Sequence, residues 1–242
     1  MHALIGLLLL LSTPPCAAQD QQAKLRVLVV TGGHDFDRPP FVTMLDSLAG
    51  IEYREVTHPQ ANDWYAADKA ATYDVLVLYD MNQDITDQQK ANFLDLLQKG
   101  KGLVVLHHAL ADYQNWDEFL KIAGGRYHLA PWVKDAQQQP ASTFQEGVDI
   151  KVHIADPDHP IIQGLTDFTL HDEVYGGYSV LPAVHPLLTT DHPQSTSTIA
   201  WTNTYGKSRS VVIQSGHGRR AYDDANYRRL LLQAMQWAAG RL

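Results

Sequence analysis

The chain has 242 residues, a formal net charge of −8 at pH 7 and a single cysteine, Cys16. The negative charge and the absence of an extended basic cluster argue against binding to a phosphate backbone, so no nucleic-acid partner is expected.

The first eighteen residues are typical of a secretory signal. An apolar run from Ala3 to Leu11 is followed by Pro14, Pro15 and the small residues 16–18. The run is too short to serve as a permanent membrane span. Cys16 could instead carry a lipid, but the two prolines disfavour that interpretation. We predict a periplasmic or secreted protein with a signal peptide over residues 1–18.

Cleavage after Ala18 would remove the only cysteine of the chain. The mature protein could then form no disulfide, and it would offer neither a thiol nucleophile nor a thiolate metal ligand. The remaining residues suit one sizeable domain, which we place at residues 24–241.

Strands and helices are predicted to alternate in the first half. The β-branched run from Arg26 to Thr31 is a buried strand that ends at Gly32 and Gly33. It is followed by a helix over 41–48, strands over 51–56 and 75–79, an amphipathic helix over 87–99 and a strand over 103–106. This order predicts a single-domain α/β fold with a doubly wound, mostly parallel, flavodoxin-like sheet.

The second half is less regular. Strands are predicted over 149–154, 187–190, 198–201 and 210–214, and a helix over 224–239. Residues 137–140 (QQQP) are expected to form an exposed turn.

Histidines follow three of the predicted strands. His34 comes after the first strand, His107 and His108 after the strand over 103–106, and His217 after the strand over 210–214. Parallel strands deliver these residues to one edge of the sheet, where ligands of such folds bind. Imidazole is a common metal ligand and transfers protons near neutral pH. Any one of these histidines alone could be a surface or capping residue.

Adjacent side chains on an extended segment point to opposite sides. Only one of His107 and His108 is therefore expected to face the site, and the other to be packed or capping.

Other polar clusters offer further candidates. Asp172 and Glu173 could act as base, metal ligand or sugar-hydroxyl acceptor, or could belong to an exposed acidic turn. His128 follows a glycine pair and could equally lie in an ordinary loop. Trp116 and Tyr175 are possible stacking platforms for sugar rings, although such aromatics are more often part of the core.

Seven short motifs, taken in order, resemble the ThuA-like (trehalose-utilisation) family over nearly the whole mature chain. They are residues 31–35 (TGGHD), 105–112 (VLHHALAD), 124–128 (GGRYH), 158–161 (DHPI), 172–175 (DEVY), 199–201 (IAW) and 216–217 (GH). The resemblance implies a fold like that of class I glutamine amidotransferases and a place in bacterial sugar catabolism. The family's His-Ala-Ala-Ala-Asp-like turn aligns with His108 and Asp112, which favours His108 over His107.

The resemblance does not carry amidotransferase chemistry over. In that fold a cysteine occupies the turn after the strand that corresponds to 103–106, and here the turn holds His107 and His108. The resemblance implies instead a small-molecule carbohydrate as the ligand. We expect Asp35, Asp112, Trp116 and Tyr175 to bind it.

The working hypothesis is a metal-dependent enzyme acting on 3-keto-glycosides or related glycosides. A divalent ion, with zinc, iron, nickel and manganese all compatible, would be held by some of His34, His108, His128, Glu173 and His217. A Lewis acid would stabilise the enediolate formed when a base removes the proton beside the ketone. Asp172 or Glu173 is the expected base, and His108 is the third expected catalytic residue.

Two alternatives remain. A non-catalytic carbohydrate-binding protein on the same scaffold would bind sugars through its aromatic residues and hold no metal. Serine hydrolysis at Ser215 is disfavoured because the Gly-x-Ser-x-Gly elbow is absent. A Ser and a His two residues apart also do not make a triad.

Overall fold

The computed structural model describes residues 23–242, and the predicted signal peptide at 1–18 lies outside the described residues. A nine-stranded sheet forms the centre of the molecule, in the order β2-β1-β3-β4-β13-β12-β11-β8-β9. Its strands are β1 (Leu25–Gly32), β2 (Ile51–Thr57), β3 (Val75–Asp80), β4 (Gly102–Leu106), β8 (Thr143–Ile154), β9 (Phe168–Gly176), β11 (His185–Thr189), β12 (Thr198–Tyr205) and β13 (Ser208–Ile213).

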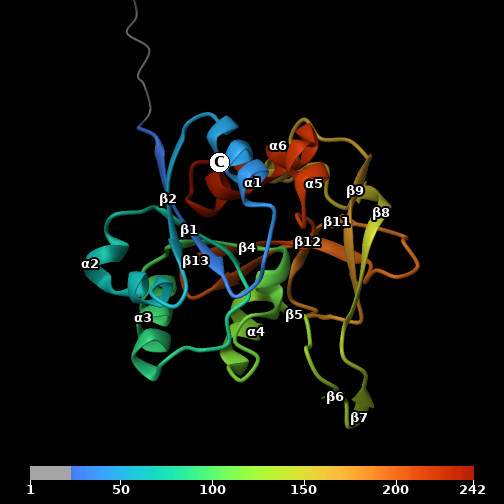
Figure 1. Ribbon diagram of the computed structural model, residues 1–242, viewed down its shortest axis with the longest axis horizontal. Coiled ribbons are helices and arrows are strands. Elements are labelled where there is room, and N and C mark those ends of the chain that lie inside the picture. Colours follow the sequence, from blue (N-terminus) through green and yellow to red (C-terminus); the bar gives the residue numbers. More distant parts are fainter. Residues whose placement is uncertain (1–22) are drawn as a thin grey trace, which may run out of the picture.

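Helices cover both faces of this sheet (Figure 1). One face carries α1 (Arg38–Ser47), α5 (Arg219–Asp223) and α6 (Ala225–Ala238), and the other carries α2 (Ala67–Ala70), α3 (Asp87–Gln98) and α4 (Asp117–Ala123). Short 3₁₀ helices lie at Ala61–Tyr65, His107–Ala111 and Pro160–Ile162. This arrangement confirms the predicted doubly wound α/β fold.

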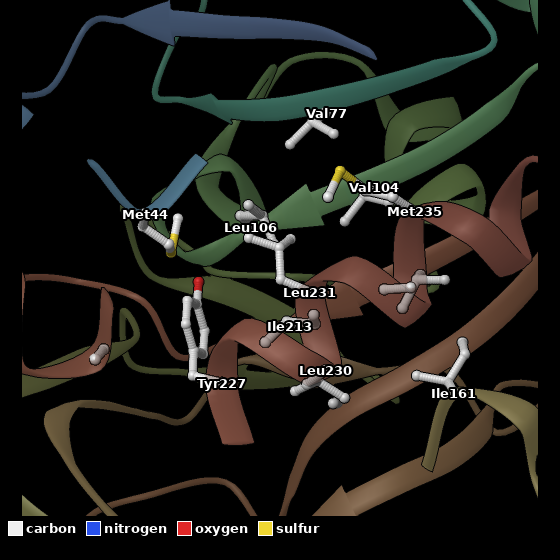
Figure 2. Packing of buried hydrophobic residues seen from close by; sticks show 14 of the residues in the cluster. Met44, Val77, Val104, Leu106, Ile161, Ile213, Tyr227, Leu230, Leu231 and Met235 are labelled. Carbon is white, nitrogen blue, oxygen red and sulfur yellow. The ribbon is translucent and has the colours of Figure 1, made fainter. Parts of the chain in front are cut away.

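Alternation along the buried strands builds the two halves of the core. In β1, Val27 and Val29 pack on the α1 and α6 side, whereas Leu28 and Val30 pack on the α3 side. Figure 2 shows the first of these layers, in which side chains of α6 such as Leu231 meet the residues of β4. Both faces of β1 are covered, so its apolar run is continuous, as the sequence indicated.

The sheet is parallel in one half and antiparallel in the other. Strands β2, β1, β3, β4 and β13 pair in parallel. Strands β12, β11, β8 and β9 then continue from β13 with antiparallel pairs. The carboxyl ends of the parallel strands therefore meet at one edge, next to the antiparallel β8–β9 ribbon.

The second half holds elements that the pattern did not predict. Asp172 and Glu173 are part of strand β9 and are buried, so they do not belong to an exposed acidic turn. The predicted turn at 137–140 was also wrong, because Gln137–Gln139 forms β7, paired with β6 (Trp132–Lys134) in a hairpin that projects from the body (Figure 1). A short ribbon pairs β5 (Gly125–Arg126) with β10 (Ser179–Val180).

Within residues 23–242, no helix has the length and apolar character needed to cross a bilayer.

Candidate functional site

A small cavity opens where the parallel strands end beside the β8–β9 ribbon. It has a volume of about 220 Å³. Its polar wall comes from loops after β1, β4 and β13 and from β9, and its other wall is largely apolar. The lining residues are His34, Met81, His108, Ala111, Tyr127, Leu129, Phe144, Glu146, Glu173, Tyr175 and His217.

Both histidines after β4 contribute to this site, so the expectation that only one would do so was wrong. The chain does not stay extended after Leu106: His107 has φ 50° and begins a 3₁₀ helix. This turn lets His108 line the cavity while the ring of His107 lies behind it, 5.3 Å away between centroids. His107 is fully buried, yet its Nε2 points toward Glu173 and His217.

The orientation of the His107 ring is fixed by the main chain. Its Nδ1 lies 2.7 Å from the carbonyl oxygen of Gln214. A carbonyl can only accept, so Nδ1 carries the hydrogen and Nε2 presents its lone pair to the site in the neutral ring. The hydroxyl oxygen of Tyr175 lies 2.9 Å from Nε2 of His107. A ring nitrogen donating to a carbonyl is the usual support of a metal-binding histidine.

Glu173 reaches the site because β9 alternates. Leu170 and Val174 pack into the core, whereas Glu173 and Tyr175 lie on the opposite face and line the cavity. The Oε2 atom of Glu173 is 2.9 Å from Nε2 of His107 and 3.2 Å from Nδ1 of His217.

The three donor atoms of His107, Glu173 and His217 lie within 4.8 Å of one another. The two histidine nitrogens are 3.1 Å apart. Metal–ligand bonds of about 2.1 Å at right angles separate neighbouring donors by about 3.0 Å. The spacing therefore fits three ligands on one face of an octahedral ion. Two histidines and one carboxylate form the donor set of many iron and zinc enzymes.

Asp172 points to the other side of β9 and does not line the cavity. Its two oxygens accept from the main-chain N–H groups of Gly216 at 2.5 Å and His217 at 3.0 Å. Burial raises the pKa of Asp172, although the charge of His107 and these N–H groups oppose that effect. Asp172 thus holds the loop that carries His217, and the geometry favours this positioning role over the predicted role as base.

The charges in the site favour an ionised Glu173. Burial alone would raise its pKa, but the interactions with the His107 and His217 rings outweigh burial and lower the pKa from 4.5 to about 2. The same bond to Glu173 raises the pKa of His217. A buried carboxylate between two imidazoles is a suitable place for a cation.

His108 and His34 form a second pair of imidazoles at the cavity. Their rings are stacked with centroids 4.6 Å apart. Burial, followed by the neighbouring imidazoles of His107 and His34, lowers the pKa of His108 well below 6.5. Both ring nitrogens of His108 lack a hydrogen-bond partner among the described residues. His108 is thus a neutral group free to bind a ligand in the cavity.

Several predicted site residues lie elsewhere. The ring of His128 stacks on Trp132 at 3.8 Å, its Nε2 lies 2.9 Å from the Ser179 hydroxyl, and it is outside the donor cluster. Asp35 is exposed beside the cavity rather than in it. Trp116 packs on Phe93 and lines a separate hollow of about 400 Å³.

Asp112 is fully buried, so the expectation that it binds substrate was wrong. It accepts a hydrogen bond from the main-chain N–H of Asn82 at 2.7 Å and thereby fixes the loop after β3. Asp80 lies beside it and is bound by His58 at 2.6 Å. Burial and the charge of Asp80 raise the pKa of Asp112 well above 3.8.

Replacing Asp112 with asparagine is expected to flatten the pH dependence of stability. The folded wild type keeps a proton on Asp112 that the unfolded chain releases near pH 4. Its free energy of unfolding therefore falls as the pH rises from about 4 toward the raised pKa. The asparagine amide would still accept from Asn82 but would have no proton to lose. Urea unfolding at pH 4 to 8 measures this slope.

The alanine variant is the matched comparison. Asp112→Ala also has no proton to lose, but it leaves the buried N–H of Asn82 without its partner, so it should be about 1–3 kcal/mol less stable than Asp112→Asn at every pH. Identical pH slopes for wild type and Asp112→Asn would contradict the assignment of a raised pKa to Asp112.

Some residues of the site were not assigned to it from the sequence. They are His107, Met81, Ala111, Tyr127, Leu129, Phe144 and Glu146. Tyr127 and Glu146 come from segments without a recognised strand pattern. Glu146 follows Phe144 by two positions on β8, so alternation along a predicted strand would have placed both on one face.

The fold and the histidine-lined edge define an α/β protein whose site occupies the place where such sheets bind ligands. The family model for trehalose utilisation (ThuA) matches residues 26–238. The chain therefore belongs to the ThuA family. A search of curated protein sequences finds no match.

Solved structures agree with this assignment. A putative ThuA-like protein from Parabacteroides merdae is 19% identical, with a TM-score of 0.75 over 89% of this chain and 90% of its own. One from Bacteroides uniformis is also 19% identical, with a TM-score of 0.66 over 93% and 95%. A putative GMP synthase subunit from Thermoplasma acidophilum is 14% identical, with a TM-score of 0.54 over 90% and 96%. The last supports the amidotransferase-like fold.

Proposed function

We propose that this protein is an exported, metal-dependent enzyme of sugar catabolism. Its substrates would be 3-keto-glycosides or related glycosides, cleaved by elimination or hydrolysis. The observation that carries the proposal is the convergence of His107, Glu173 and His217 on one point beside a cavity. Membership of the ThuA family supplies the link to sugars. Export rests on the sequence of residues 1–18.

The donor set supports zinc, iron, nickel or manganese as the ion, because imidazole and carboxylate suit all four. A bound divalent cation would supply Lewis-acid stabilisation of charge that develops on the substrate ketone. Glu173 contacts both histidines and so serves as a ligand in this proposal rather than as the base.

His108 is the proposed proton acceptor. It is neutral, it lines the cavity, and neither ring nitrogen is bound to the described part of the chain. A neutral imidazole next to the substrate can take the proton from the carbon beside a ketone. His34 stacks on this ring and is itself exposed. Asp172 fixes the loop of His217 from behind.

Metal removal tests this function. Treatment with a strong chelator should lower turnover of methyl 3-keto-β-D-glucopyranoside at least tenfold, and one of the four metals should restore it. Release of methanol provides the measurement. Turnover that is unaffected by chelation would contradict the metal-dependent mechanism. Binding of the glycoside without turnover under every metal would favour the carbohydrate-binding alternative.

A further inference from the structure

The mouth of the cavity carries exposed apolar side chains. Phe144 is 61% exposed and Leu129 is 46% exposed, and both line the cavity. Among residues 23–242, the exposed large hydrophobic residues are these two, Val133 and Leu242. Exposed apolar groups gathered at the opening of a polar site indicate a binding surface.

Strand pairing directs Phe144 toward the site. Phe144 on β8 lies directly opposite Tyr175 on β9, and such a pair shares one face of the ribbon. Tyr175 is the residue whose hydroxyl reaches His107. Its ring also contacts Tyr127 at 4.8 Å between centroids. Aromatic side chains, Tyr175, Tyr127 and Phe144, therefore line the cavity that holds the donor atoms.

The size of the cavity leaves part of a glycoside outside. Its volume of about 220 Å³ is below the roughly 300–1,000 Å³ of pockets that enclose a drug-sized ligand. A sugar ring placed against His108 and Glu173 would fill the polar interior. Its anomeric substituent would then have to leave through the mouth, past Phe144 and Leu129.

From these observations we infer that Phe144 and Leu129 form a subsite for the leaving group. The substrates would be glycosides with an apolar or aromatic aglycone. The inference rests on the proposed function, since it assumes that the sugar occupies the interior. The inference is based on the position of the two exposed side chains, and it does not depend on which metal is bound.

Paired glycosides test this subsite by calorimetry. The probes are phenyl and methyl β-D-glucopyranoside, which lack the ketone and so are not expected to be turned over. The wild type should bind the phenyl compound about tenfold more tightly, because an aromatic ring gains stacking and apolar contact on Phe144. Phe144→Ser should bring the ratio of the two affinities close to one, because it weakens binding of the phenyl compound more than binding of the methyl compound.

Val133→Ser is the matched control. Val133 is 63% exposed on the β6–β7 hairpin but does not line the cavity, so this variant should keep the tenfold ratio. A ratio near one in the wild type, no binding of the phenyl compound, or a ratio unchanged in Phe144→Ser would overturn the subsite. The subsite would also be overturned if Phe144→Ser kept the ratio of affinities but changed the oligomeric state. That result would show that Phe144 contacts a second copy of the chain. If chelation did not change turnover, the proposed metal-dependent function would be contradicted, but the subsite would not.

Discussion

Glu173→Gln is expected to lower turnover of a 3-keto-glycoside by at least about a hundredfold and to leave the fold intact. Glutamine keeps the size of the side chain but removes the negative charge that lies between His107 and His217. A neutral amide is a poor ligand for a divalent ion, and loss of one electrostatic partner in a catalytic site costs about a hundredfold or more. Steady-state kinetics at saturating metal measures the effect.

Glu146→Gln is the control for this variant. Glu146 lines the same cavity, but its Oε1 is 4.0 Å from His217, and the side chain is largely exposed. Its charge is screened by solvent, so turnover should change by no more than a few fold. Equal losses in the two variants would show that general negative charge, and not a carboxylate at the donor cluster, is what matters.

The second large effect is expected at Gly33, where alanine should cost about 3 kcal/mol or more of unfolding free energy. Gly33 has φ +76°, and a Cβ there would lie 2.0 Å from the carbonyl oxygen of Met81. Left-handed backbone costs an L-residue about 1–2 kcal/mol, and overpacking adds about 1–3 kcal/mol. The clash with Met81 could be relieved only by moving the turn that carries His34, so turnover should fall as well. Urea unfolding gives the stability.

Gly50→Ala separates the two contributions. Gly50 has nearly the same φ, +79°, with no atom within 4 Å of the added carbon. It should cost only the backbone term of about 1–2 kcal/mol. If both alanine variants lost the same free energy of unfolding, close packing of Gly33 against Met81 would be refuted.

The parallel half of the fold could be predicted because its strands are buried on both faces. The apolar runs of β1, β3 and β4, with the capped amphipathic helix α3 between β3 and β4, gave the correct order of elements. The histidines at the strand ends follow from the same topology, and His34, His108 and His217 do line one cavity.

The antiparallel half could not be predicted as well, because β8 and β11 are only partly buried and β9 carries polar residues at buried positions. The polar residues of β9 hid its alternation, yet that alternation alone separates Glu173 in the cavity from Asp172 behind it. The role of His107 was missed for a local reason. A positive φ at a residue without a glycine's freedom leaves no signal in the pattern.

Motif resemblance gave positions along the chain without side-chain directions. Asp112 lies in a family-like turn, yet its carboxyl faces the interior and holds the loop after β3. Trp116 and His128 flank the site in sequence, but their rings pack against Phe93 and Trp132. Contacts between distant segments decide such directions, and a linear pattern does not contain them.

The metal content of the purified protein tests the central claim most directly. Wild type and Glu146→Gln should each hold close to one equivalent of a divalent transition metal after reconstitution and desalting, as measured by elemental analysis. Glu173→Gln should hold much less, because it lacks the carboxylate that joins His107 and His217. Metal absent from the wild type, or retained fully by Glu173→Gln, would contradict the assignment of these three residues as a metal site.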